Sequence, residues 1–172
     1  MKHAFALATL LLVSLNSSPL LANTSLSNTP LKTVGKAEMR WLMFPLYQIS
    51  LKTPDGRYQE NRFPQVLDIT YRRDIDKRDL LTATDQQWQR LGLPQAQRQN
   101  WINQLHAIWP TVKSGDQLGF KLDSQGKNYF TYNGKKIGGV ADAQFGQSFL
   151  AIWLSPKTSQ PGIRQRLIGP NS

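Results

Sequence analysis

Few side chains in this sequence of 172 residues belong to types that carry out covalent or metal chemistry. There is no cysteine, which excludes disulfides, thiol nucleophiles and thiolate metal sites. Apart from His3, the single histidine is His106, which stands on the flank of an apolar helical stripe, four residues after Ile102. No nucleophile or carboxylate lies near it in sequence. We therefore expect neither a zinc site nor a histidine-based catalytic centre.

Three acids, Asp74, Asp76 and Asp79, cluster before and within the first turn of a predicted helix. Carboxylates could bind a hard cation, but this segment lacks the glycine and the closing glutamate of a calcium loop. Carboxylates at a helix N-terminus also complement the helix dipole. We interpret the cluster as the start of a helix, and we expect no metal and no cofactor.

One arginine stands in line with a long apolar segment, RWLMFPLYQISL, at residues 40–51. Arg40 begins this segment, Tyr47 lies on it, and Tyr71 ends the next predicted strand. An arginine and a tyrosine above an apolar cavity would suit a carboxylate that carries a hydrocarbon tail. A surface ion pair is the other interpretation of Arg40, because arginine is seldom buried. The residues alone leave both interpretations open.

Blocks of strand and helix patterns follow one another along the chain. In chain order they are an extended segment over 34–53, a strand over 66–71, helices over 76–91 and 94–110, strands over 118–140 and a helix from about Asp142. Segregated blocks of this kind favour an α+β fold with a largely antiparallel sheet and helices layered on one face.

The apolar residues of 40–51 do not alternate with polar ones, as they would in a strand with one solvated face. We therefore predict a central strand here, kinked at Pro45, with helices on one side and apolar material on the other.

The first 22 residues, MKHAFALATLLLVSLNSSPLLA, have a basic start, an apolar run and a small residue at Ala22. This is the layout of a cleavable secretory signal, and its apolar run is shorter than the about 20 residues of a membrane-spanning helix. We expect a signal peptide over 1–22, a flexible lead-in over 23–33 and a single domain over 34–172. The signal predicts an exported, periplasmic protein; an uncleaved anchor is the alternative.

The charge balance is strongly basic, with 21 Lys and Arg against 11 Asp and Glu. Export argues against nucleic acid as the partner. Peripheral attraction to anionic membrane lipid, or to an anionic ligand, is one interpretation. A well-solvated surface is the other, because charges of both signs are interspersed, as in YRRDIDKRD.

Three segments together resemble the bacterial, exported branch of the chalcone isomerase-like family. They are GKAEMRWLMFPLYQISLKTPDGRY at 35–58, ITYRRDIDKRDLLTATDQQWQRLG at 69–92 and FLAIWLSPKTSQPGIRQRLIG at 149–169. The resemblance covers about residues 31–169. It implies a chalcone isomerase-like α+β fold, in which helices pack on a large antiparallel sheet with a hydrophobic cleft between them.

The resemblance also bears on activity, because the enzymes of this family cyclise chalcones without a cofactor, whereas other members bind fatty acids or assist partner proteins. Matching the motifs puts the polar groups of the enzymes near Leu42, Asp76, Ala83 and Ile152, so those polar residues are not retained. Leu42 and Ile152 cannot donate a hydrogen bond to an oxygen that gains charge.

The resemblance therefore implies a non-catalytic, cofactor-free periplasmic protein that binds a small lipophilic ligand such as a fatty acid. In that role Arg40 pairs with the ligand carboxylate, and Tyr47 or Tyr71 adds a hydrogen bond. Four apolar residues would line the cleft: Leu42, Phe44, Phe149 and Trp153.

Two alternatives stay open. Arg40 could supply the cation for a cofactor-independent isomerase, an intramolecular lyase that acts on a chalcone-like or other unsaturated carbonyl compound. The cleft could instead be filled by its own side chains, in a protein-interaction module. A filled and an empty cleft need the same apolar residues, so the composition does not separate them.

Overall fold

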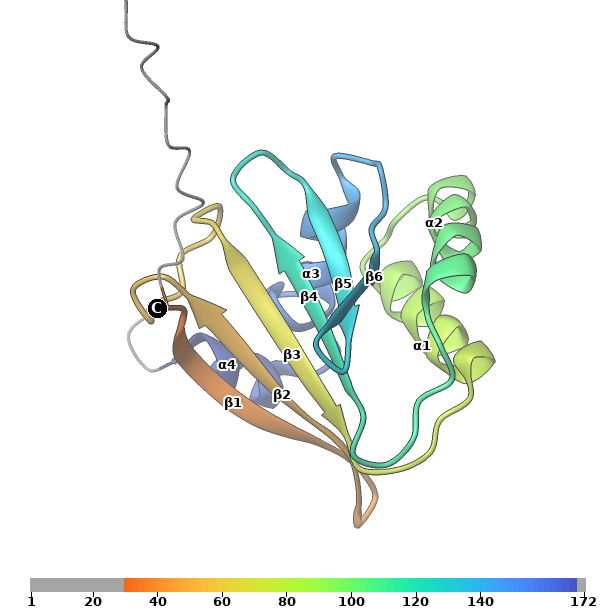
Figure 1. The fold of residues 1–172 in the computed structure, drawn as a ribbon, viewed down its shortest axis with the longest axis horizontal. Helices are drawn as coiled ribbons and strands as arrows, with labels where there is room; N and C mark the ends of the chain where they lie inside the picture. The colour runs from red at the N-terminus through yellow and green to blue at the C-terminus, as the bar shows by residue number, and fades with distance from the viewer. Residues whose placement is uncertain (1–29, 170–172) are drawn as a thin grey trace, which may run out of the picture.

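The computed structural model describes residues 30–169, so the predicted signal peptide and most of the predicted lead-in lie outside the described residues. Figure 1 shows its elements, which in chain order are β1 (Lys32–Trp41), β2 (Phe44–Thr53), β3 (Gln65–Tyr71), α1 (Lys77–Arg90), α2 (Gln95–Ile108), β4 (Gln117–Leu122), β5 (Asn128–Tyr132), β6 (Lys135–Gly138), α3 (Phe145–Leu154) and α4 (Pro161–Ile168). The first strand starts two residues before the predicted Val34.

The strands form one six-stranded sheet in sequence order, and each pairs antiparallel with the next. Figure 1 shows α3 and α4 behind this sheet, with the α1–α2 pair beside β5 and β6. The prediction of an α+β fold with a largely antiparallel sheet and helices on one face is confirmed. Within residues 30–169, no helix is both long and apolar enough to span a lipid bilayer.

Alternation along the central strands gives the sheet one apolar face and one polar face. In β3, Leu67, Ile69 and Tyr71 are buried, whereas the intervening Asp68 and Thr70 are half-buried. The Asp68 carboxylate forms an ion pair with the ammonium group of Lys52 on the neighbouring strand, 2.6 Å away. A strand with this pattern packs its apolar face against another layer and leaves its polar face in water. Here the helices form that layer.

Seven rings form an aromatic cluster between the sheet and the helices. They belong to Trp88, Trp101, Trp109, Phe120, Phe130, Phe145 and Phe149, each at most 4% exposed. Their ring centroids lie 4.6–6.1 Å apart, mostly in edge-to-face geometry. Two of the indoles satisfy their N–H groups: Trp88 donates to the Ser148 carbonyl at 2.9 Å and Trp101 to the Asp142 carboxylate at 2.8 Å. The cluster is the centre of the core.

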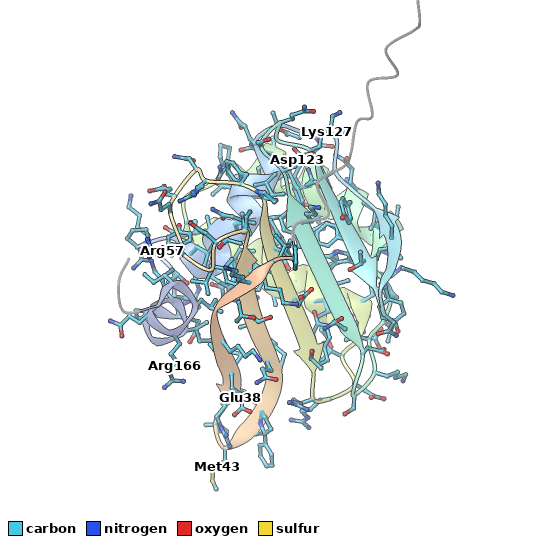
Figure 2. The ribbon with its side chains drawn as sticks, turned by 60° about the vertical axis from the view of Figure 1, so that its left-hand side comes forward. Glu38, Met43, Arg57, Asp123, Lys127 and Arg166 are labelled. Carbon is cyan, nitrogen blue, oxygen red and sulfur yellow. The ribbon has the colours of Figure 1, made fainter. Side chains whose placement is uncertain are left out.

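The segment 34–53 is a hairpin, so the prediction of one extended stretch with a central strand over 40–51 is wrong. The chain reverses between β1 and β2, and Trp41 pairs with Phe44 across the turn. We call residues 41–44 the hairpin tip; Trp41, Leu42, Met43 and Phe44 are 63, 78, 81 and 57% exposed. Figure 2 shows Met43 at one extremity of the molecule. The apolar run is therefore unalternating because it turns back through solvent, not because it is covered on both faces.

Candidate ligand-binding cavity

A cavity of about 430 Å³ opens between the sheet and the helices α1 and α3. Residues of β1–β4 line it from the sheet side, and residues of α1 and α3 line it from the helix side. Its volume falls in the range of about 300–1,000 Å³ that small-molecule sites occupy. The cleft between sheet and helices is therefore open rather than filled by side chains.

Four of the seven predicted site residues meet at this cavity. Tyr47 comes from β2, Tyr71 from β3, and Phe149 and Trp153 from successive turns of α3. Tyr47 and Tyr71 are direct partners in the β2–β3 register, which brings their rings to the same face. The spacing of Phe149 and Trp153, four residues apart on a helix, places both on the face that packs towards the sheet.

The other three predicted site residues, Arg40, Leu42 and Phe44, do not line the cavity. Leu42 and Phe44 belong to the hairpin tip, because the chain turns at 42–43 instead of continuing through the sheet. Arg40 donates to the Glu38 carboxylate at 2.6 Å and to the Met43 carbonyl at 2.8 Å, and so braces the turn. Of the two interpretations of Arg40, the surface ion pair describes the observed contacts.

Two phenols stand side by side in the cavity wall. The rings of Tyr47 and Tyr71 lie 6.1 Å apart at 69°, and the Tyr47 hydroxyl accepts a hydrogen bond from the Trp153 indole at 3.1 Å. Burial raises the pKa of Tyr47, against the lowering effect of that hydrogen bond. Burial, and then the neighbouring Tyr47, raise the pKa of Tyr71 strongly. Both phenols are therefore neutral donors at any physiological pH.

The indole N–H of Trp109 is a buried donor beside the cavity. Trp109 lines the cavity, is 4% exposed, and its indole N–H makes no hydrogen bond within residues 30–169. Buried N–H groups are nearly always paired, since an unmade bond costs the desolvation of the donor. The N–H of Trp109 is thus a polar group that the fold itself does not use.

Arg73 is the cation of the cavity, and the sequence pattern did not single it out. It is exposed yet lines the cavity, two residues beyond Tyr71, so it stands at the mouth. Its guanidinium lies 5.5 Å from the centroid of the Phe44 ring, and it forms no ion pair in the described part of the chain. Its position just after a core strand could have indicated a site residue. The run of mixed charges at 72–79 around it is instead typical of a solvated surface.

Two acids, Asp74 and Asp79, line the cavity beside Arg73, and Asp79 forms no ion pair within residues 30–169. Asp74 pairs with Lys113 at 3.0 Å and accepts the Ser114 backbone N–H at 2.9 Å. Asp76 accepts from the Thr111 hydroxyl, 3.2 Å away, where α1 begins. Between residues 30 and 169, no group of three or more histidines and acids is arranged to hold a metal ion.

Two positions matched to polar residues of the isomerases do lie at the cavity. Ala83 of α1 and Ile152 of α3 both line it, and both are apolar. Leu42 lies at the hairpin tip instead, so its match to a strand residue of the enzymes carries no structural meaning. The cavity therefore lacks hydrogen-bond donors at Ala83 and Ile152.

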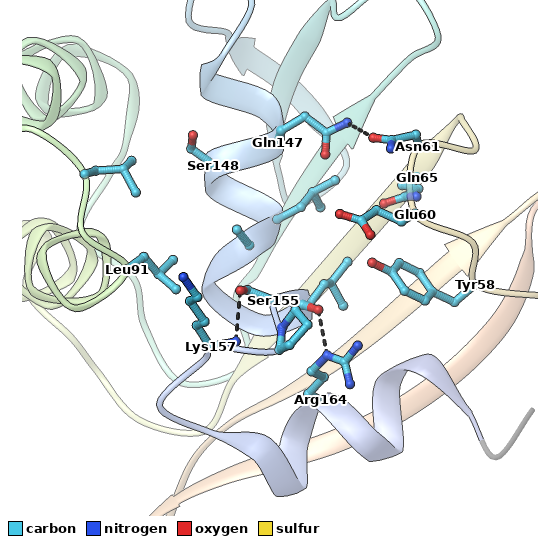
Figure 3. A pocket seen from close by; sticks show the side chains of 15 residues that line it. Tyr58, Glu60, Asn61, Gln65, Leu91, Gln147, Ser148, Ser155, Lys157 and Arg164 are labelled. Atoms are coloured by element: carbon cyan, nitrogen blue, oxygen red, sulfur yellow. Dashed lines mark hydrogen bonds between the residues drawn. The ribbon is translucent and has the colours of Figure 1, made fainter. Parts of the chain in front are cut away.

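A second, polar pocket of about 320 Å³ lies on the opposite side of α3. In Figure 3, Gln147 reaches across it to Asn61, and Arg164 donates through Nε to the Leu154 carbonyl at 2.8 Å. Glu60 and Lys157 bring both signs of charge to its lining. Because these polar groups tie the β2–β3 loop and α4 to α3, the pocket is less suited to an apolar ligand than the first cavity.

The chain belongs to the chalcone isomerase-like family, whose model matches residues 15–169. An uncharacterized protein of Haemophilus influenzae is 29% identical to it over 136 residues, which cover 79% of this chain and 67% of that protein. The crystal structure of a fatty-acid binding protein of Arabidopsis thaliana is similar with a TM-score of 0.59 and 9% identity, over 81% of this chain and 85% of that one. At this identity the similarity concerns the fold alone. The predicted chalcone isomerase-like family and fold are thus confirmed, whereas the exported branch stays a prediction.

Proposed function

We propose that this protein binds a fatty acid, or another lipid with a long chain and an anionic head, and that it does so without catalysis and without a cofactor. The observation that carries the proposal is the combination of an open apolar cavity, two neutral phenols in its wall and an unpaired arginine at its mouth. The similarity in fold to a plant fatty-acid binding protein supports it.

The apolar wall and the polar groups suit different parts of such a ligand. A hydrocarbon tail gains about 0.8 kcal/mol for each methylene that leaves water for an apolar cavity. A carboxylate at the mouth would meet Arg73, which forms no ion pair within residues 30–169. The hydroxyls of Tyr47 and Tyr71 would donate to the same head or to a water beside it.

We also propose that the ligand is bound in the periplasm. The support is the layout of residues 1–22, which has the basic start, short apolar run and small terminal residue of a secretory signal. A carrier with an apolar cavity would shield a lipid tail from water between two membranes.

Calorimetric titration of the delipidated protein with palmitate tests the proposal. Arg73→Gln should weaken binding about tenfold, because a hydrogen bond to a charged group is lost, which is worth about 1.5 kcal/mol. Arg72→Gln is the matched control: it removes the same charge from the adjacent residue, whose side chain donates to Gln48 and does not line the cavity. Its affinity should stay within about twofold of the wild type.

A second pair of variants shows whether palmitate occupies this cavity. Ala83→Trp would plug the mouth from an exposed position of α1, whereas Thr82→Trp places the same ring on the neighbouring exposed residue, which does not line the cavity. Binding that survives Ala83→Trp would contradict the assigned site. Turnover of a chalcone by the purified protein would favour the isomerase instead.

A further inference from the structure

The hairpin tip exposes apolar surface that the fold leaves uncovered. Its four consecutive residues are the large apolar side chains that stand exposed within residues 30–169. Exposed apolar surface concentrated in one place marks a site of contact with a partner or a membrane. In Figures 1 and 2 the tip projects from one end of the sheet, away from every helix.

The turn at the tip is built from residues that do not favour turns. Leu42 has a φ of 54°, in the left-handed region that glycine and asparagine adopt more readily. Neither Leu42 nor Met43 packs against the core. These two side chains therefore act outside the fold.

Cationic side chains lie directly behind the tip. The Arg73 guanidinium lies 5.5 Å from the Phe44 ring, and the Arg72 backbone N–H donates to the Leu46 carbonyl at 2.8 Å. Glu38 and Asp74, which share this end of the molecule, are each held in an ion pair, with Arg40 and Lys113. Neither Arg72 nor Arg73 forms an ion pair in the described part of the chain.

The apolar surface continues from the tip to the cavity. Met39 of β1 and Leu46 of β2, which both line the cavity, each lie two residues from the tip. Arg73 belongs to both regions, because it lines the cavity mouth and contacts Phe44. A molecule at the tip therefore stands at the entrance of the cavity.

We propose that the hairpin tip inserts into the surface of an anionic lipid bilayer and so opens the cavity mouth onto the membrane. A stable protein interface buries about 800 Å² on each partner, which a narrow projecting turn of four residues does not offer. Aromatic and aliphatic side chains backed by arginines suit the boundary between lipid head groups and chains. That a lipid passes from the membrane into the cavity rests on the proposed function, whereas the insertion itself does not.

The absence of cysteine allows a direct test. Met43→Cys, labelled with an environment-sensitive fluorophore, should shift its emission to the blue when vesicles of phosphatidylcholine and phosphatidylglycerol are added. The same label at Lys127→Cys, in the turn between β4 and β5 at the opposite end of the sheet, should not shift (Figure 2). An unchanged Met43→Cys emission in the presence of vesicles would overturn the proposal.

Vesicle cosedimentation separates the apolar and the charged contributions. Leu42→Ser with Met43→Ser should weaken binding about a hundredfold, and Arg72→Gln with Arg73→Gln about tenfold. Arg57→Gln with Lys127→Gln, which removes two charges from the opposite end, should change it less than about twofold. If both charge variants lost vesicle affinity equally, the assignment of the membrane contact to the end of the molecule that carries the tip would be overturned.

The two proposals fail separately. Leu42→Ser with Met43→Ser should leave palmitate affinity in solution unchanged, since neither residue lines the cavity. Vesicle binding without palmitate binding would contradict the proposed function alone. A dimer in solution that the same double variant dissociates would show that a second copy covers the tip, and it would overturn the membrane contact.

Discussion

The aromatic cluster and the hairpin tip are made of the same kinds of side chain in opposite environments. The rings of the cluster are at most 4% exposed, whereas Trp41, Leu42, Met43 and Phe44 are 57–81% exposed. The rings of the cluster come from α1, α2, α3, β4 and β5 and from Trp109 just after α2, whereas the tip consists of the last pair of the β1–β2 ladder and the turn that joins it. Large apolar residues thus stand both at the centre of the core and on one exposed turn.

The contrast shows which apolar residues the fold depends on. A chain without cysteine has no disulfides to hold it together and depends on packing, and the cluster supplies the largest buried side chains. The tip contributes little to packing and carries a residue in an unfavourable backbone conformation. Stability should therefore respond to the cluster and membrane binding to the tip.

Phe145→Ala should produce the largest effect. Phe145 is fully buried and stacks against Phe149 with ring centroids 5.8 Å apart. Truncation leaves a cavity among close-packed rings, and the free energy of unfolding should fall by about 3–5 kcal/mol, measured by urea denaturation. Its counterpart Phe44→Ala, at the tip, should cost about 1 kcal/mol at most, through lost contact with Arg73.

Comparing the losses in free energy of unfolding of Phe145→Ala and Phe44→Ala tests whether the tip belongs to the core. If Phe44→Ala were as destabilising as Phe145→Ala, the tip would belong to the core and the contrast would be wrong. Far-ultraviolet circular dichroism of both variants before denaturation establishes that each is folded at the start.

Leu42→Gly should change the free energy of unfolding less than Phe145→Ala does, and it should raise that free energy rather than lower it. Glycine adopts the φ of 54° without the penalty of about 1–2 kcal/mol that a side chain brings, although it loses more backbone entropy on folding. We expect the free energy of unfolding to stay equal or to rise by up to about 1 kcal/mol, while vesicle binding weakens. A clear loss of stability in urea would mean that Leu42 packs in the fold after all.

The helices could be predicted because their apolar spacing reflects how they pack. The predicted helices over 76–91 and 94–110 correspond to α1 at Lys77–Arg90 and α2 at Gln95–Ile108. Their buried residues, such as Trp88 and Trp101, recur on one face because that face packs against the other helix of the pair and against Phe145 of α3. The antiparallel sheet followed from the same block order.

The hairpin and the mouth of the cavity could not be predicted in this way. A turn made of Leu42 and Met43 has none of the Gly, Asn or Asp residues that mark a reversal, so the apolar run predicts a buried strand instead. Tyr47 and Tyr71 were found because they lie on core strands. The sequence pattern does not predict the place of Arg73. Whether a residue between β3 and α1 lies at the cavity mouth depends on how these two elements pack in space, and residue spacing along the chain does not show that.

Tyr71→Phe should have the smallest effect on the fold. Burial and the neighbouring Tyr47, with no hydrogen bond, cause the pKa shift of Tyr71, so removing its hydroxyl should change stability at pH 7 by less than about 0.5 kcal/mol, whereas palmitate affinity should fall severalfold. The raised pKa of Tyr71 stabilises the folded state fully below its ordinary value of 10.0, and this contribution is lost as pH rises above that value. Urea denaturation above pH 10 should therefore show a shallower loss of stability in the variant than in the wild type. A variant that is unstable at neutral pH would show that the hydroxyl serves the fold rather than the ligand.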